Sequence, residues 1–277
     1  KVFAKTVLMD PRFAKAHDNG DIHIHDLDFY ATGTLTCCQT DPLKLFANGG
    51  FNTGHGHLRT PNSIASYAAL AAIILQANQN EQHGGQSIPN FDYAMAPGVN
   101  KSFKKALRSN LEKYNKYSGK KVDVKIPDDI TYGDNETLKK LKIPETVIET
   151  SNEDVEKQTF QAMEGFIHNL NTMHSRAGAQ VPFTSINFGT DTTPAGRLVS
   201  KNLLDATEKG LGHGETPIFP ISIFKVKEGV SYNPEDPNYD LFKRSMEVSS
   251  KRLFPNFTFI DAPFNIKYYK KGDYNTE

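Results

Sequence analysis

In the second half of the chain, short apolar segments alternate with longer segments of helical periodicity. Apolar runs at 181–188, 218–226 and 256–260 have the length of strands, and amphipathic runs at 197–209 and 239–252 have the length of helices. Strands that alternate with helices pair in parallel, because each helix carries the chain back across one face of the sheet. The sequence therefore predicts an α/β fold built on a parallel sheet.

Two further helices are expected upstream of this pattern. The alanine-rich run 64–79 follows Thr-Pro at 60–61, which is typical of a helix start. A stripe of apolar residues marks another helix near 160–174, and we expect the glycine-containing stretch 176–178 to cap its end. Residues 34–39 are expected to form a strand that precedes both helices.

The composition suits a folded chain of one α/β unit or two small domains. The 277 residues include 18 Phe and 11 Tyr, and 32 basic residues balance 32 acidic ones, so no global charge attracts nucleic acid or an anionic membrane. Within 101–157 a basic run is followed by an acidic run. Such runs usually form the solvent-exposed face of a helix or loop. The alternative is that 101–157 is an excursion, meaning an inserted segment used for regulation or subunit contact.

Cysteine content and hydropathy favour a cytoplasmic location. Two cysteines cannot build a disulfide framework, and the longest apolar run, 68–75, is too short to span a bilayer. The chain starts at a lysine and ends in polar sequence, so we expect a piece of a larger protein. Walker, Gly-x-Gly-x-x-Gly, Gly-x-Ser-x-Gly and paired Cys-x-x-Cys motifs do not occur in the sequence, which argues against the protein classes that use them.

The adjacent residues Cys37 and Cys38 are the first candidates for chemistry. A disulfide between neighbours would be strained, since their Cα atoms lie about 3.8 Å apart. On a strand the two side chains point to opposite faces, so at most one of them faces a given site. Two interpretations stay open: both cysteines are small packed residues, or one is a reactive thiol that faces a pocket.

Two His-x-His pairs are candidates for metal binding. His23 and His25 stand among aspartates, and His55 and His57 form the second pair. On a strand, both imidazoles of a pair would lie on one side. The further ligands that a metal needs are not identifiable, and such residues also form ordinary hydrogen-bonded corners, so we predict no metal site.

Three other segments are candidates for ligand binding. The pair Gly84–Gly85 allows close approach of a ligand, and the helix start at 60–63 has amides that suit a phosphate. The segment 171–180 joins a helix to a strand and contains Arg176. Each also has an ordinary explanation: the glycine pair as a helix cap with a turn, the segment 60–63 as a plain helix end, and the segment 171–180 as a connecting loop.

Five sequence blocks resemble, in the same order, the catalytic barrel of anaerobic (class III) ribonucleoside-triphosphate reductases. The blocks are Gly-Asp-Ile-His-Ile-His-Asp-Leu-Asp-Phe-Tyr at 20–30 with Thr-Cys at 36–37, Pro-Asn-Ser-Ile at 61–64, His-Gly-Gly-Gln-Ser-Ile-Pro-Asn at 83–90, Gln-Val-Pro-Phe at 180–183 and Thr-Pro-Ile-Phe-Pro at 216–220. The resemblance implies a glycyl-radical enzyme that removes the 2′-hydroxyl of ribonucleotides. It also implies a ten-stranded α/β barrel made of two parallel half-sheets.

Compared with the family pattern, residues 1–277 correspond to the N-terminal half of this barrel. The ATP-binding regulatory domain, the radical-cysteine loop and the glycyl-radical domain of the family have no counterpart in the sequence. We therefore expect half a barrel with a charged excursion at 101–157, and no turnover by this chain alone.

The resemblance implies roles for individual residues. Cys37 aligns with the family's catalytic barrel-strand cysteine, and Cys38 falls on a tolerant position and is expected to pack. Thr36, Gly84 and Gly85 would approach the ribose of the substrate.

Two further roles concern nucleotide phosphates and allostery. Ser63, at the helix start, is our candidate for a contact to the phosphates of the substrate, in one substrate-binding group with Thr36, Gly84 and Gly85. By resemblance, the loop 172–180 would be the specificity loop that links an effector nucleotide to the substrate base, with Arg176, Gly178 and Gln180 as its candidate residues. We expect this loop to be mobile in the present chain.

The resemblance also implies cofactors and partners. These are a glycyl radical outside this chain, ATP or deoxynucleotide effectors, and formate or a thioredoxin-like thiol protein as reductant. Zinc is expected only in the family's C-terminal part. A radical-SAM enzyme would activate the protein, which would be a homodimer at full length.

Two alternatives from other classes remain. A glycyl-radical lyase of the pyruvate formate-lyase type shares the barrel and carries a Cys-Cys pair, although there the pair lies on the central loop. In a non-catalytic nucleotide-binding module, the cysteine pair would be inert.

Overall fold

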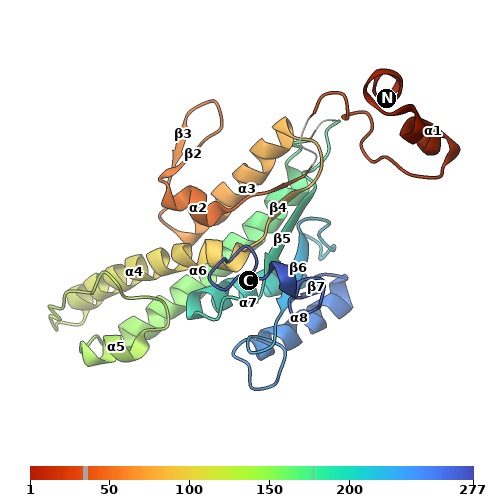
Figure 1. Ribbon diagram of the computed structural model, residues 1–277. Helices are drawn as coiled ribbons and strands as arrows, with labels where there is room; N and C mark the ends of the chain where they lie inside the picture. Colours follow the sequence, from red (N-terminus) through yellow and green to blue (C-terminus); the bar gives the residue numbers. More distant parts are fainter. Residues whose placement is uncertain (34–36, 177) are drawn as a thin grey trace.

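Five parallel strands form the central sheet (Figure 1). The computed structural model describes residues 1–33, 37–176 and 178–277. The strand order is β1-β4-β5-β6-β7, and each neighbouring pair is parallel. The strands are β1 Cys38–Gln39, β4 Gln86–Ile88, β5 Thr184–Phe188, β6 Ile221–Val226 and β7 Asn256–Phe259. The predicted α/β fold with a parallel sheet is confirmed.

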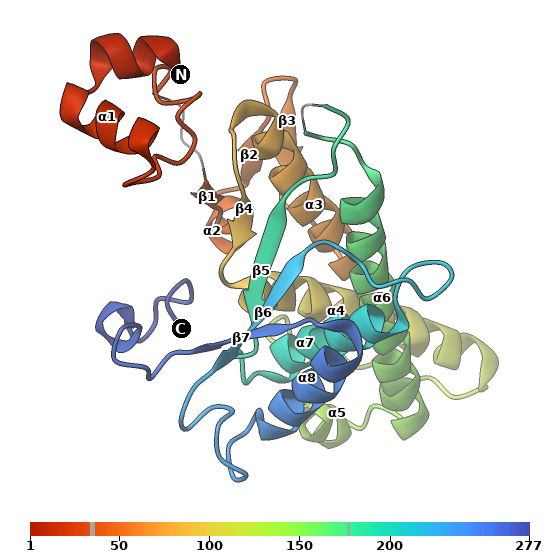
Figure 2. The same cartoon turned by 90° about the vertical axis from the view of Figure 1, so that its right-hand side faces the viewer.

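Helices cover one face of this sheet, and the C-terminal segment runs on the other side (Figure 2). Ile186 and Phe188 of β5 and Phe224 of β6 are fully buried in the core that the sheet forms with the helices. The helices of this layer are α3 Ile64–Glu81, α4 Phe91–Tyr117, α6 Glu145–Thr172, α7 Pro194–Lys209 and α8 Tyr239–Arg252. One face of the sheet is therefore packed, and the other is covered much less.

Residues 1–30 form a small unit that projects from the sheet (Figure 1). It contains the π-helix η1 Ala4–Leu8 and the helix α1 Pro11–Asn19, which have a hydrophobic cluster of their own around Met9 and Leu27. The remaining short elements are α2 Pro42–Ala47, the hairpin strands β2 Gly50–Asn52 and β3 His57–Arg59, α5 Asn135–Lys140 and the 3-10 helix η2 Ile266–Tyr268. No helix in the described part of the chain is long and apolar enough to cross a membrane.

Several element boundaries differ from the predicted ones for local chemical reasons. β5 begins at Thr184 and β6 at Ile221, just after Pro182 and Pro220, which lack the amide hydrogen that a strand needs. α6 ends at Thr172, so the stretch 176–178 is not its cap. α8 has the predicted bounds.

The charged stretch 101–157 begins inside α4 and ends inside α6. Phe103, Leu107 and Val155 lie within it and are fully buried in the core. Its charges therefore belong partly to the solvated faces of two core helices. An excursion in the expected sense is limited to 118–144, the segment that connects them.

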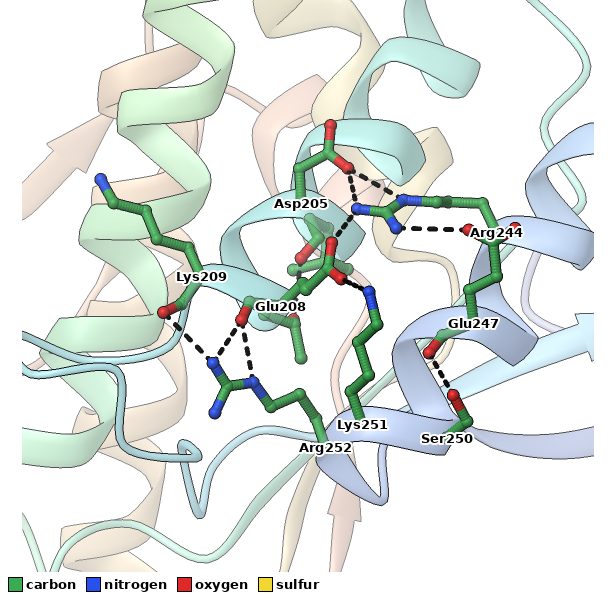
Figure 3. Close-up of polar contacts among 10 residues, drawn as sticks. Asp205, Glu208, Lys209, Arg244, Glu247, Ser250, Lys251 and Arg252 are labelled. Carbon is green, nitrogen blue, oxygen red and sulfur yellow. Dashed lines mark hydrogen bonds and ion pairs between the residues drawn. The ribbon is translucent and has the colours of Figure 1, made fainter.

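A cluster of ion pairs holds α8 against α7 (Figure 3). Arg244 Nη2 lies 2.8 Å from Asp205 Oδ1 and also contacts the carboxylate of Glu208, which in turn pairs with Lys251. Arg252 Nε donates to the backbone carbonyl oxygen of Glu208 at 2.8 Å, near the end of α7. Hydrogen bonds from Lys251 and Arg244 lower the pKa of Glu208 to about 2.

Candidate active site

The amino ends of β1, β4 and β5 bring three of the sequence blocks together. Because parallel strands start at the same edge, Cys37, Gly85 and Phe183, each one residue ahead of its strand, become neighbours. The Cys38 amide donates to the Gly85 carbonyl oxygen at 3.0 Å, and the Gln86 amide donates to the Phe183 carbonyl oxygen at 2.9 Å. Open α/β sheets usually bind ligands at the carboxyl edge, whereas the candidate residues here meet at the amino edge.

The two cysteines differ in burial, as the alternation of side chains along a strand leads one to expect. Cys38 is half-buried and in register with the buried Gln86, on the face that the helices cover. Cys37 is exposed and precedes β1, so the strand starts one residue later than expected. The interpretation of two buried cysteines is therefore wrong. Thr36, predicted beside them, lies outside the described residues.

The turn at Gly84–Gly85 favours glycine at the first position and leaves little room for a side chain at the second. Gly84 has a φ of +91°, in the region that side chains disfavour, and a Cβ on Gly85 would lie 3.1 Å from Cδ1 of Phe183. The buried Gln79 holds the turn, because its Nε2 donates to the Gly84 carbonyl oxygen at 2.8 Å. Its Oε1 accepts the Phe183 amide at 3.2 Å, which ties the turn to the start of β5.

The N-terminal unit reaches this turn through His83. The Nε2 of His83 lies 3.3 Å from Oδ1 of Asp26, and its ring stacks on Phe29 with centroids 3.9 Å apart and planes at 16°. Sequence reasoning missed this contact. His83 and Asp26 both stand in blocks that carry the family resemblance, but no spacing rule connects residues so far apart in the chain.

The His-x-His pairs occupy loops and a hairpin. His23 and His25 are exposed and follow α1 in a loop, with ring centroids 5.8 Å apart. His57 lies in β3, where its Nε2 is 3.1 Å from the Gly49 carbonyl oxygen. Across the described residues, no three His, Cys, Asp or Glu side chains are arranged to hold a metal ion.

Ser63 lies at the opposite end of α3 from the glycine turn. It forms a capping box: the Ser66 amide donates to Ser63 Oγ at 3.3 Å, and the Ser63 amide donates to Ser66 Oγ at 3.0 Å. α3 has 18 residues and is therefore about 27 Å long. Ser63 borders a cavity of about 340 Å³ that Lys105 and Lys113 also line. The structure thus separates Ser63 from the other candidate substrate contacts.

The loop 172–180 closes into a turn. Arg176 and Gln180 exchange two backbone hydrogen bonds, of 3.1 and 3.3 Å, and Gly178 has a φ of +82°. Asn171, which the sequence reasoning did not single out, anchors the loop: its Oδ1 accepts the Ile218 amide at 2.9 Å. This contact brings the start of the loop to the block at 216–220.

The carboxyl edge of the sheet holds buried charges that no sequence motif indicated. Asp92 is 1% exposed, and its Oδ2 accepts the amides of Gly189, Thr190 and Asp191 at 2.8, 3.1 and 3.0 Å. Asp191 is also buried. Desolvation, and then the charge of Asp92, raise the pKa of Asp191 to about 6. Burial lowers the pKa of Lys225, which lies near Asp92.

Comparison with known families gives one match over nearly the whole chain. A family model described as anaerobic ribonucleoside-triphosphate reductase matches residues 1–276. The reductase of that name from Enterobacteria phage T4 is 34% identical over 251 residues, which cover 90% of this chain and 36% of the relative. The one from Escherichia coli K12 is 29% identical over 257 residues, covering 92% of this chain and 32% of the relative. The chain therefore spans about a third of the length of these relatives.

Solved structures have the same fold. The anaerobic ribonucleotide reductase from Thermotoga maritima in complex with dATP and CTP aligns with a TM-score of 0.57 and 14% identity, over 91% of this chain and 37% of that chain. Its structure with dATP bound in the specificity site gives a TM-score of 0.54 and 15% identity, over 91% and 38%. These alignments agree with the predicted half-barrel.

Proposed function

Because this chain belongs to the anaerobic ribonucleoside-triphosphate reductase family, we propose that it supplies one part of an enzyme that reduces ribonucleoside triphosphates to 2′-deoxyribonucleoside triphosphates. The observation that carries the proposal is the exposed thiol of Cys37 next to the Gly84–Gly85 turn. The chain spans about a third of its relatives, so the other two thirds are needed for turnover.

In this proposal Cys37 is the catalytic residue of the chain. Its thiol donates a hydrogen atom to the ribose, and its sulfur then bonds to a second cysteine outside 1–277. Loss of the 2′-hydroxyl as water is thereby balanced by oxidation of two thiols to a disulfide. The family's glycyl radical, also outside this chain, supplies the unpaired electron that starts the reaction.

Thr36, Gly84 and Gly85 are the proposed ribose contacts. Support for the two glycines comes from their position beside the cysteines and from the absence of side chains, which allows a sugar to approach the backbone. Cys38 packs toward the helices and takes no part in the chemistry.

Ser63 is the proposed phosphate contact, but a nucleotide bound there cannot also touch Gly84, about 27 Å away along α3. It would be a second nucleotide, in the role of an effector. An adjoining cavity of about 540 Å³ is lined by Lys101, Lys104 and Arg108, whose positive charges suit a triphosphate.

The loop 172–180 is proposed to connect effector and substrate. The planar guanidinium group of Arg176 can donate hydrogen bonds to a base or a phosphate. Gly178 and Gln180 belong to the same closed turn. Such a loop transmits a signal if each ligand favours one of its arrangements.

The remaining parts of the proposal concern cofactors, partners and location. They are ATP or deoxynucleotide effectors, formate or a thiol protein as reductant, zinc in the C-terminal part of the family's chain, a radical-SAM activating enzyme, a homodimer and a cytoplasmic location.

The test is turnover by the complete enzyme. Full-length protein, activated without oxygen by a radical-SAM enzyme, is expected to convert ribonucleoside triphosphates to deoxynucleotides in the presence of formate or a reduced thiol protein. Conversion of pyruvate and coenzyme A without nucleotide reduction would support the lyase alternative. Nucleotide binding without either reaction would support the non-catalytic module.

A further inference from the structure

One short turn of the N-terminal unit supplies both contacts to His83. The Phe29 amide donates to the Asp26 carbonyl oxygen at 2.9 Å, so the Asp26 carboxylate and the Phe29 ring are presented together. Asp26 has a φ of +51°, which is uncommon for a residue with a side chain. This backbone conformation places the Asp26 carboxylate at one edge of the His83 imidazole and the Phe29 ring against its face.

The contact joins two parts of the chain that have separate hydrophobic clusters, that of the N-terminal unit and the main core. His83 stands two residues after the last residue of α3 and directly before Gly84. The side chains of His83 and Asp26 are 27% and 20% exposed, so water only partly screens the pair.

A direct covalent and hydrogen-bonded route leads from His83 to the cysteines. His83 is two residues from Gly85, whose carbonyl oxygen accepts the Cys38 amide at 3.0 Å. Cys37 is covalently next to Cys38, and its side chain is exposed. A shift of the glycine turn would move the β1 backbone and, with it, the Cys37 sulfur.

We propose that His83 is a positioning residue for the reaction: held by Asp26 and Phe29, it sets the Gly84–Gly85 turn against β1 and thereby fixes the place of the Cys37 thiol. The inference rests on the proposed role of Cys37 as the reacting thiol. In this proposal His83 acts through the turn and not by contact with the substrate.

Gln79 and His83 attach to the turn from different sides. Gln79 holds the Gly84 carbonyl oxygen from inside the helical layer. His83 provides the second attachment, from the N-terminal unit. Two attachments on different sides restrict the turn more than one, and hydrogen transfer between a thiol and a carbon is sensitive to displacements of about 1 Å.

The experiment measures structure and turnover in the same full-length variants. His83→Ala removes the proposed contact, His83→Gln keeps a donor for Asp26 without the ring, and Asp26→Ala removes the carboxylate. His213→Ala is the matched control, because His213 is an exposed histidine in the loop after α7. Hydrogen exchange of peptides that cover 37–40 and 82–88 reports on the Cys38–Gly85 hydrogen bond without any need for catalysis.

For His83→Ala we expect faster exchange of the Cys38 amide and a fall in kcat of about ten- to a hundredfold, with KM changed by less than about twofold. His83→Gln should recover part of the loss. The double variant His83→Ala/Asp26→Ala should lose no more than His83→Ala alone, because His83→Ala already removes the contact to Asp26. His213→Ala should match the wild type.

Unchanged exchange at 37–40 in His83→Ala would overturn the inference. So would a rise in KM at constant kcat, which would mean that His83 binds substrate directly. If the wild-type enzyme reduces no ribonucleotide, the proposed function fails. The exchange measurements would then still decide whether His83 positions the cysteine strand.

Discussion

The backbone amide of Cys38 donates to the carbonyl oxygen of Gly85, 3.0 Å away. This hydrogen bond aligns β1 with β4 and turns the Cys38 side chain toward the helices. The adjacent Cys37 is left exposed on the other side. Two thiols that are neighbours in the sequence therefore meet different surroundings, and only one of them can face a ligand on the less covered face.

The first prediction separates the two cysteines by activity. In full-length, radical-activated enzyme, Cys37→Ser should abolish deoxynucleotide formation, because a hydroxyl cannot form the disulfide that balances the reduction. Cys38→Ala should retain turnover and lose about 1–3 kcal/mol of stability from reduced packing. Deoxynucleotide yield and thermal unfolding are the measurements. Equal loss of activity in both variants would contradict the assignment.

The second prediction concerns effector control. Gly178→Val places a β-branched residue at a φ of +82°, where nothing lies within 4 Å of the new Cβ, so the strain is in the backbone alone. The variant should lose discrimination between substrate bases more than it loses maximal rate. Competition among ribonucleotides, with and without each effector, measures the effect. Gly212→Ala, at another glycine with open space around it, is the control; an unchanged preference in Gly178→Val would show that this loop does not set specificity.

The third prediction is a pH dependence of stability from Asp191. Its pKa is raised from 3.8 to about 6 in the folded protein, which corresponds to about 3 kcal/mol. This stabilisation is complete below pH 3.8 and is lost as the pH rises through about 6. Asp191→Asn, which removes the titrating group, should remove the fall in stability over this range. Urea unfolding at a series of pH values tests it, and a parallel fall in the variant would assign the effect to another group.

The fourth prediction concerns the ion-pair cluster between α7 and α8. The pKa of Glu208 is lowered to about 2, so its stabilisation is present above its ordinary pKa of 4.5 and is lost as the pH falls toward 2. Because solvent reaches the cluster, Glu208→Gln should cost no more than about 1 kcal/mol at neutral pH, and less at high salt. Thermal unfolding at low and high salt measures this. Glu228→Gln, an exposed glutamate outside the cluster, should show no such salt dependence.

The sequence predicted those features that depend on local chemistry. The strand–helix alternation after residue 180 indicated the parallel sheet, and Thr-Pro ahead of 64 indicated the start of α3. Gly84 and Gly85 stood out because few other residues fit such a turn. Three of the blocks of family resemblance converge at one edge, because that edge collects the starts of parallel strands.

Features that depend on distant pairings could not be predicted. The contact between Asp26 and His83 joins residues 57 positions apart, and Asn171 holds a backbone amide 47 positions away. The sequence did not show that parts of α4 and α6 within 101–157 are buried in the core, because charged residues on their solvent-exposed faces dominate the composition of this stretch. Ser63 was grouped with the glycine turn, since the sequence does not show to which end of a helix a binding site belongs.

α3 and α6 run in the same direction and end at the same edge, one before the glycine turn and the other before the loop 172–180. Gln76 of α3 donates to Asn169 of α6 at 2.5 Å near these ends. A helix resists compression along its axis, so a displacement at the Ser63 end of α3 is passed on to its other end at Glu81, three residues before Gly84. If an effector nucleotide binds beside Ser63 as proposed, the two helices connect that site mechanically to the glycine turn, and binding at one end of α3 shifts the turn at the other.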